Sequence, residues 1–501
     1  MTPWLFHAGD YRMIYPEIVL SLFGLAILAF DFLLDRSTRY LNAVAAVAAL
    51  GLAGAQLGVF GASLHNGSYQ EAFAGVLRMD AFSVSLQLII VISTALVVLL
   101  SARYLEIERA NYGEYYALLL FTAVGMMLMA AGTDLIVLFL SLELMAFCEY
   151  ILTGFLRGAR TSNEAAIKFF LLGAFSSGLL LYGFSLLYGL SGSTRLSVVA
   201  RFVAQRPFGY PLAWMAMITV LAGLFFKLAA VPFHQWTPDA YEGAPTSITA
   251  FISVAPKVAS FAIFLRILLV AIWPMRAEWQ PLVIGVAVAT MTIGNLAAIT
   301  QSNIKRFFGY STISHVGYLL LGVVAAADGN GEGLAAILIY LLVYAFMNLG
   351  AFAVVVVMRR KDLAGDSIRD FTGLITRSPG LAILMAVFLL SLAGIPPTAG
   401  FIGKYYIFLS LIQTGHYYLA VLAVTYSVIG LYYYMRIVSV MFMHEASESV
   451  EFGQPVDQAP INVPLGLGVA LAVTIALTLV IGIFPEPFIQ VAHQAIRPFF
   501  S

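Results

Sequence analysis

The chain has 501 residues, of which 61% are hydrophobic and only 10% are charged. A soluble domain carries about 25% charged residues, so this composition excludes an ordinary soluble protein and indicates a membrane protein. The 26 basic and 26 acidic residues cancel, which argues against a nucleic-acid partner, because phosphate binding needs a basic excess. Cys148 is the single cysteine, which excludes disulfide frameworks and cysteine-ligated metal centres.

Apolar runs of about 20 residues, long enough to cross the hydrocarbon core as a helix, recur along the whole chain. They predict an all-α polytopic membrane protein with about 14 transmembrane helices and no separate soluble domain. The first run lacks a basic flank and a small-residue cleavage site, so we expect it to remain as the first helix. In chain order the predicted spans are 15–34, 41–61, 82–101, 114–131, 134–153, 165–190, 212–236, 247–272, 281–300, 309–327, 332–358, 379–414, 417–442 and 463–485.

Basic residues are divided unevenly between the loops on the two sides of these spans. Cytoplasmic loops carry the excess of Lys and Arg in membrane proteins. This bias predicts that both termini lie on the non-cytoplasmic side. The richer side would hold Arg36, Arg39, Arg103, Arg109, Arg157, Arg160, Lys305, Arg306, Arg359, Arg360, Lys361, Arg369 and Arg377, and the other side Arg12, Arg78, Arg195, Arg201, Arg206, Arg276 and Arg497.

The remaining basic residues lie inside the predicted spans, where a Lys or Arg costs roughly 2.5–3.5 kcal/mol at the helix centre. Three of them, Lys168, Arg266 and Arg436, lie near span ends, and we expect their long side chains to reach the interface. The other three lie nearer the centres of their spans: Lys227, Lys257 and Lys404.

Among the acidic residues, Glu143 is the one that we expect at a comparable depth. One interpretation is structural, with the deep charges locking helices together as buried ion pairs. Three lysines cannot each pair with one glutamate, which favours a second interpretation. Burial disfavours the charged form of a lysine, and a neighbouring carboxylate favours it. A lysine that gains and loses such a partner can take up and release a proton, as translocation across a membrane requires.

Two spans contain proline breaks. Lys227–Pro232 runs into a polar stretch at 233–241, and Ser391–Pro396 runs into Pro397. Proline inside a helix removes a hydrogen bond, and in lipid the freed backbone groups must be buried in protein or line a wet cavity. The two hexapeptides align with Pro232 and Pro396 at the same offset, five spans apart. They therefore predict broken helices seven and twelve of an inverted repeat.

Two histidines are secondary candidates for proton relay. His234 follows the first break, and His315 lies in the tenth span. Histidine titrates near physiological pH, although a lone histidine in a membrane helix is as often a satisfied hydrogen-bonding residue. No dinucleotide fingerprint or phosphate loop is present, so we expect no cofactor or metal in this chain.

These motifs resemble the antiporter-like membrane subunits of respiratory complex I, which are related to multisubunit sodium/proton antiporters. The resemblance covers residues from about 80 to 440 and is most specific in the run Pro-Phe-His-Gln-Trp-Thr-Pro-Asp. Within the family the chain is most similar to the subunit N type of bacterial NADH:quinone oxidoreductase, because a lysine stands at position 404. The segments that carry it are Leu140–Met145, Lys227–Pro245, Pro256–Lys257, Ser302–Tyr318 and Leu392–Lys404.

The resemblance implies a division of the chain and a role for each candidate residue. Three helices would lie in 1–110, inverted five-helix repeats in 114–272 and 281–442, and the last helix in 463–485. Glu143 and Lys227 would form a modulating ion pair, Lys257 would be the central proton carrier, and Lys404 would pass the proton towards the other half-channel. His234 and His315 would be accessory relays, and the breaks would lie at Pro232, Pro396 and Pro397.

The resemblance also implies partners. The chain would be a non-redox subunit of a proton-translocating NADH:quinone oxidoreductase in the bacterial inner membrane. NADH, FMN, iron–sulfur clusters and quinone would be bound by other subunits. Partners would include the antiporter-like subunit M, small membrane subunits such as K, and lipid. A cation/proton antiporter without a redox partner stays an alternative, as does a purely structural role for the buried charges.

Overall fold

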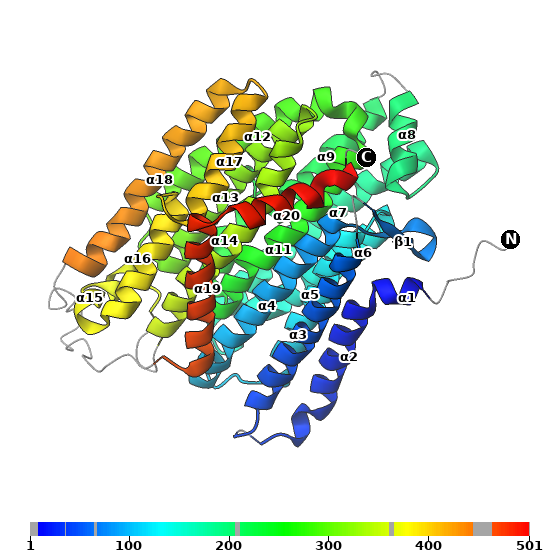
Figure 1. Cartoon of the computed structure of the whole chain (residues 1–501). Coiled ribbons are helices and arrows are strands. Elements are labelled where there is room, and N and C mark those ends of the chain that lie inside the picture. Colours follow the sequence, from blue (N-terminus) through cyan, green and yellow to red (C-terminus); the bar gives the residue numbers. More distant parts are fainter. Residues whose placement is uncertain are drawn as a thin grey trace.

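The fold is a bundle of long helices, seen in a computed structural model (Figure 1). The structure describes residues 9–35, 37–64, 68–205, 211–359, 365–443 and 463–499. Four of the basic residues used to predict orientation lie outside these ranges: Arg36, Arg206, Arg360 and Lys361.

Within the described ranges, 13 helices are long and apolar enough to cross a membrane. The remaining predicted span is divided into α16 (Pro379–Ala393) and α17 (Ala399–Gln413), each of 15 residues and too short to count alone. Every predicted span is therefore helical, and the all-α polytopic fold is confirmed. The 13 are α2 (Tyr15–Phe30), α3 (Tyr40–Ser63), α4 (Ala81–Ile107), α5 (Gly113–Ala131), α6 (Leu135–Thr153), α7 (Arg160–Ser191), α9 (Pro211–Leu228), α11 (Thr246–Arg266), α12 (Arg276–Ile299), α13 (Ile304–Ala327), α14 (Gly331–Met358), α18 (Tyr417–Met443) and α19 (Leu465–Ile483).

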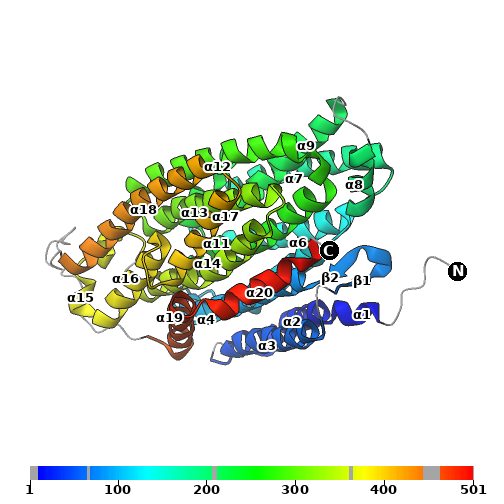
Figure 2. The ribbon, with the colours of Figure 1, turned by 45° about the horizontal axis from the view of Figure 1, so that its top comes forward.

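Shorter elements join these helices, and the sequence did not predict them because none is long enough to span. The last helix, α20, packs across α14 and α4 (Figure 2). The short helices are α1 (Asp10–Met13), α8 (Leu196–Gln205), α10 (Trp236–Gly243), α15 (Leu374–Arg377) and α20 (Glu486–Ile496). The strands β1 (Gln70–Ala72) and β2 (Leu77–Met79) form an antiparallel hairpin. Single turns lie at Asp31–Leu33, Phe73–Gly75, Ile267–Ala271, Trp273–Met275, Ile368–Phe371 and Arg497–Phe499.

Three helices, α11, α13 and α14, form the centre of the bundle. About nine tenths of each span is buried inside the protein (89%, 94% and 94%), against 28% for α2 and for α18. A helix that is apolar on all sides is suited to such a position. Polar side chains on these three helices are therefore held away from lipid. This placement keeps Lys257 on α11 and His315 on α13 out of contact with lipid.

The two proline breaks share a local backbone geometry. Ala229 (φ 64) follows α9 and Gly394 (φ 88) follows α16, both in the left-handed region. In each break a cis peptide bond comes shortly after, before Pro232 in the first and before Pro397 in the second. Pro232 and Pro397 each stand three residues after the left-handed residue that ends the helix, so Pro232 corresponds to Pro397, one residue later than the alignment with Pro396 predicted. The prediction aligned the two hexapeptides by the type of their residues. In the structure, the residue at which each helix ends sets the correspondence.

Candidate functional site

The first break is capped by Lys257. Its side chain is 2% exposed, and its Nζ donates hydrogen bonds to the carbonyl oxygens of Lys227 and Leu228, each at 3.2 Å. These are the last carbonyls of α9, which lack intrahelical partners because the helix ends there. The carbonyl end of a helix carries partial negative charge and favours a cation. The Trp236 ring lies 4.8 Å from the same Nζ and adds a cation–π contact.

The second break is capped in the same way by Lys404. Its buried Nζ donates to the carbonyl oxygen of Ala393 at 2.8 Å, and Ala393 is the last residue of α16. The Ser427 hydroxyl on α18 lies 3.0 Å from Nζ and itself donates to Ala393 at 3.2 Å. Tyr318 lies beneath the ammonium, with its ring centre 5.0 Å away. Both breaks thus create an ammonium-binding site from helix-end carbonyls.

Lys227 occupies the last turn of α9 and is also buried. Its Nζ lies 3.5 Å from the hydroxyl of Tyr150. Glu143 interacts with it electrostatically, but within the described ranges no carboxylate oxygen lies within the 4.0 Å of an ion pair. Glu143 is only partly buried, and its Oε1 has no hydrogen-bond partner there. The two side chains expected to pair are therefore neighbours that are not in direct contact.

His315 on α13 lies at the centre of a hydrogen-bonded chain of side chains from α13, α14 and α18. Its Nδ1 is 2.6 Å from the Tyr340 hydroxyl, and its Nε2 is 3.1 Å from the Tyr434 hydroxyl. Tyr434 continues the chain to the hydroxyl of Ser311 at 2.5 Å. Helix α13 packs against both α10, after the first break, and α17, after the second. His315 therefore lies on a helix that contacts the segments after both breaks, and it interacts electrostatically with Lys404.

His234 has a different environment. It follows Pro232 in the first break and is partly buried. Its Nδ1 is buried and makes no hydrogen bond to the described residues. The three break prolines, Pro232, Pro396 and Pro397, are exposed on the isolated chain. His234 is thus near the first lysine site in sequence without a direct bond to it.

Lys227, Lys257, Lys404 and His315 are part of a larger set of buried polar residues, which we call the polar axis. Several of its members were not predicted from the sequence. On α14, Tyr344 donates to Thr312 of α13 at 2.9 Å, and Asn348 donates to Ser253 of α11 at 2.7 Å. Tyr340, Tyr344 and Asn348 are spaced four residues apart, so they share one face of α14. That spacing of polar groups in an otherwise apolar span was the available signal. These contacts connect α11, α13 and α14 through polar groups.

Glu149 corrects the expectation that Glu143 is the single deep acid. Glu149 is 3% exposed and more deeply buried than Glu143. It interacts electrostatically with both Lys227 and Lys257. The sequence analysis did not single it out, because it lies four residues before the end of α6, where a carboxylate can often reach water. Tertiary packing buries that end of the helix.

The basic residues predicted to reach the interface behave differently from one another. Lys168 is exposed and pairs with two surface acids, and Arg436 is exposed and donates to the carbonyl of Ile299. For Arg266 the prediction was wrong. It is buried, with Nη2 3.2 Å from Asp80 and 2.7 Å from the Ser83 hydroxyl. A buried carboxylate partner replaces the contact with the membrane surface.

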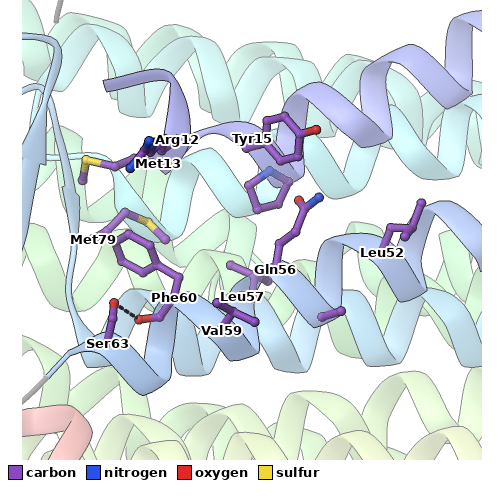
Figure 3. A pocket seen from close by; sticks show the side chains of 12 residues that line it. Arg12, Met13, Tyr15, Leu52, Gln56, Leu57, Val59, Phe60, Ser63 and Met79 are labelled. Atoms are coloured by element: carbon purple, nitrogen blue, oxygen red, sulfur yellow. Dashed lines mark hydrogen bonds between the residues drawn. The ribbon is translucent and has the colours of Figure 1, made fainter. Parts of the chain in front are cut away.

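A separate cavity of about 570 Å³ lies between α2 and α3, near α1 (Figure 3). Its lining is mostly apolar and includes Leu52, Phe60 and Met79, with Gln56 as a polar exception. None of the axis lysines lines it. The polar axis and this cavity are therefore distinct features of the chain.

Comparison with known families agrees with this geometry. Residues 131–430 match the family described as NADH:quinone oxidoreductase/Mrp antiporter, TM. The chain belongs to this family. The matched region contains Glu143, Glu149, Lys227, Lys257 and Lys404.

Individual relatives extend the match to almost the whole chain. A protein of Koribacter versatilis named NADH-quinone oxidoreductase subunit N 1 is 50% identical, over 99% of this chain and 97% of that protein. A chain in the solved structure of respiratory complex I from Thermus thermophilus with bound aureothin is 30% identical, with a TM-score of 0.78, covering 95% and 99% of the two chains. A chain of the Mrp complex from Dietzia sp. is 22% identical over 97% of both, with a TM-score of 0.83, which shows the fold alone.

Proposed function

We propose that this chain is a proton-translocating membrane subunit, of the subunit N type, in an NADH:quinone oxidoreductase. The observation that carries the proposal is the capping of both helix breaks by buried lysines. Lysines capping the ends of broken helices inside the bundle are groups that can hold a proton and then pass it on. The 50% identity to a relative named as subunit N supports the complex I assignment over a stand-alone antiporter.

In each break, carbonyl oxygens that cannot move without rebuilding the helix end accept hydrogen bonds from the lysine and favour its protonated form. Glu143 and the Tyr150 hydroxyl act on Lys227, and a change at Lys227 alters the field at Lys257. A proton that leaves Lys257 passes towards the hydroxyl chain around His315. Lys404 receives it at the second break. The unpaired Nδ1 of His234 makes it an accessory group at the first break.

The surroundings of the chain follow from the same proposal. Electron transfer from NADH through FMN and iron–sulfur clusters to quinone takes place in partner subunits. The chain lies in the bacterial inner membrane beside other membrane subunits, with both termini on the non-cytoplasmic side. Residues 114–272 and 281–442 act as two related halves, each with one break.

The test is the variant Lys257→Ala in the complete enzyme, assayed in sealed membrane vesicles for NADH oxidation and proton uptake. We expect assembled enzyme that has lost most of its proton translocation. Lys168→Ala, which removes an exposed lysine, is the matched control and should pump normally. Full NADH oxidation with normal pumping in Lys257→Ala would contradict the proposal, and sodium-dependent proton exchange by the purified chain alone would favour an antiporter.

A further inference from the structure

Glu149 is a buried acid to which neither the family motif nor the proposed lysine sequence gives a role. Its side chain is 3% exposed, and its Oε1 has no hydrogen-bond partner in the described part of the chain. Burying an ionised carboxylate without partners is costly, so such a group is either neutral or close to a cation. The two cations near it are Lys227 and Lys257.

Glu149 and Glu143 point to different environments although they share α6. Six residues separate them, which corresponds to about 9 Å along the helix and a rotation of roughly 240°. Glu143 lies next to the exposed side chains of Leu140, Leu144 and Phe147. Glu149 lies on the inner side. The two carboxylates therefore cannot replace one another.

The inner carboxylate lies in a cluster of two positive charges. Lys227 and Lys257 repel one another, and Glu149 is the acid that attracts both. Glu143 acts on Lys227. The other titratable groups near this cluster in the described residues are the thiol of Cys148 and the hydroxyls of Tyr150, which lies beside Lys227, and of Tyr241 on α10. Glu149 is therefore the acid that acts on Lys257, across more than the 4.0 Å of a direct ion pair.

We propose that Glu149 is a proton-exchanging carboxylate of the translocation path and the acid partner of Lys257. This inference rests on the proposed function. When the two side chains approach, the ammonium of Lys257 gives its proton to the carboxylate of Glu149, which converts a charged pair into a neutral amine and a neutral acid. The reverse step returns the proton to Lys257, from which it moves on towards the hydroxyl chain around His315. The net charge of the pair is zero before and after, so the transfer leaves no isolated charge in the low-dielectric interior. The unpartnered Oε1 is the free acceptor position for that proton.

The decisive variant is Glu149→Gln in the complete enzyme, because glutamine keeps the shape and cannot accept the proton. We expect assembled enzyme that has lost most of its proton translocation per NADH oxidised, and Glu149→Asp should recover part of it. Adding Glu149→Gln to Lys257→Ala should cause no further loss, since residues that act as one unit are not additive. Glu164→Gln, which changes an exposed acid on the neighbouring helix α7, is the control.

Two outcomes would overturn the inference. Normal pumping by Glu149→Gln, while Lys257→Ala is inactive, removes Glu149 from the path and leaves the proposed function intact. Normal pumping by both variants contradicts the proposed function itself. If Glu149→Gln does not assemble, Glu149→Leu decides, because an assembled and normally pumping Leu variant reduces Glu149 to a structural residue.

Discussion

The Nζ atom of Lys257 lies 3.2 Å from the backbone carbonyl oxygen of Lys227. The side chain of Lys257 is thus bound to the main chain of Lys227. That carbonyl is available because α9 ends there and provides it with no backbone N–H partner. A change in the side chain of Lys227 acts on Lys257 through the electric field, while the position of Lys257 is held by the backbone. Under the proposed function, this arrangement would separate the group that regulates, Lys227, from the group that carries the proton, Lys257.

The Ser427 hydroxyl provides a first prediction about the second break. Ser427→Ala removes one of the two hydrogen-bond acceptors of the Lys404 ammonium. A hydrogen bond to a charged group contributes about 1.5–3 kcal/mol, so we expect the charged form of Lys404 to be destabilised by that order and pumping to fall. Proton uptake per NADH in vesicles measures the effect. Ser439→Ala, on the same helix but away from the break, should behave like the wild type.

The close packing of Gly400 on the α16 end of the second break provides another prediction. A Cβ atom at Gly400 would overlap the carbonyl oxygen of Ser391, so α16 and α17 would have to move apart. Overpacking of this kind costs about 1–3 kcal/mol, and the movement would displace Lys404 from Ala393. We expect Gly400→Ala to lower both thermal stability and pumping. Gly380→Ala, with no atom within 4 Å, should change neither.

The hydroxyl chain through His315 predicts a relay defect. Tyr434→Phe keeps the ring and removes the hydroxyl that joins His315 to Ser311. Two hydrogen bonds are lost, each of which contributes about 0.5–1.5 kcal/mol, so we expect a stability loss of about 1–3 kcal/mol together with a clear fall in pumping. Tyr432→Phe is the control, since Tyr432 is exposed on the same helix. Unchanged proton translocation in Tyr434→Phe would exclude this chain as the route between the lysines.

Arg266 predicts a stability effect that is independent of pumping. Arg266→Leu leaves the carboxylate of Asp80 buried without its cation, which costs about 3–5 kcal/mol. We expect poor assembly and a lower unfolding temperature. The double variant Asp80→Asn/Arg266→Leu should recover much of the stability, because the uncompensated charge is gone. Equal stability of the single and double variants would show that the pair contributes no coupling.

The axis shows how far the sequence predicts a site of this kind. The three deep lysines and both breaks could be located because a charge or a proline in an apolar run is conspicuous. The inner acid could not, because Glu149 lies near a span end, where most carboxylates reach water. The prediction for Arg266 was wrong for the same reason, because it also lies near a span end. Depth along a helix is visible in sequence, whereas the direction of a side chain towards lipid or protein depends on its neighbours.

The sequence by itself determined the number of spanning segments and the places where two of them break. Lipid offers no hydrogen bonds to an open backbone, so hydropathy and proline leave few alternatives. Only the tertiary structure decided which carbonyls each lysine caps, that Lys227 contacts the Tyr150 hydroxyl without an ion pair to Glu143, and that the buried Glu149 interacts electrostatically with Lys257. Those contacts join helices far apart in the chain, and they depend on how the helices rotate and pack rather than on any local pattern.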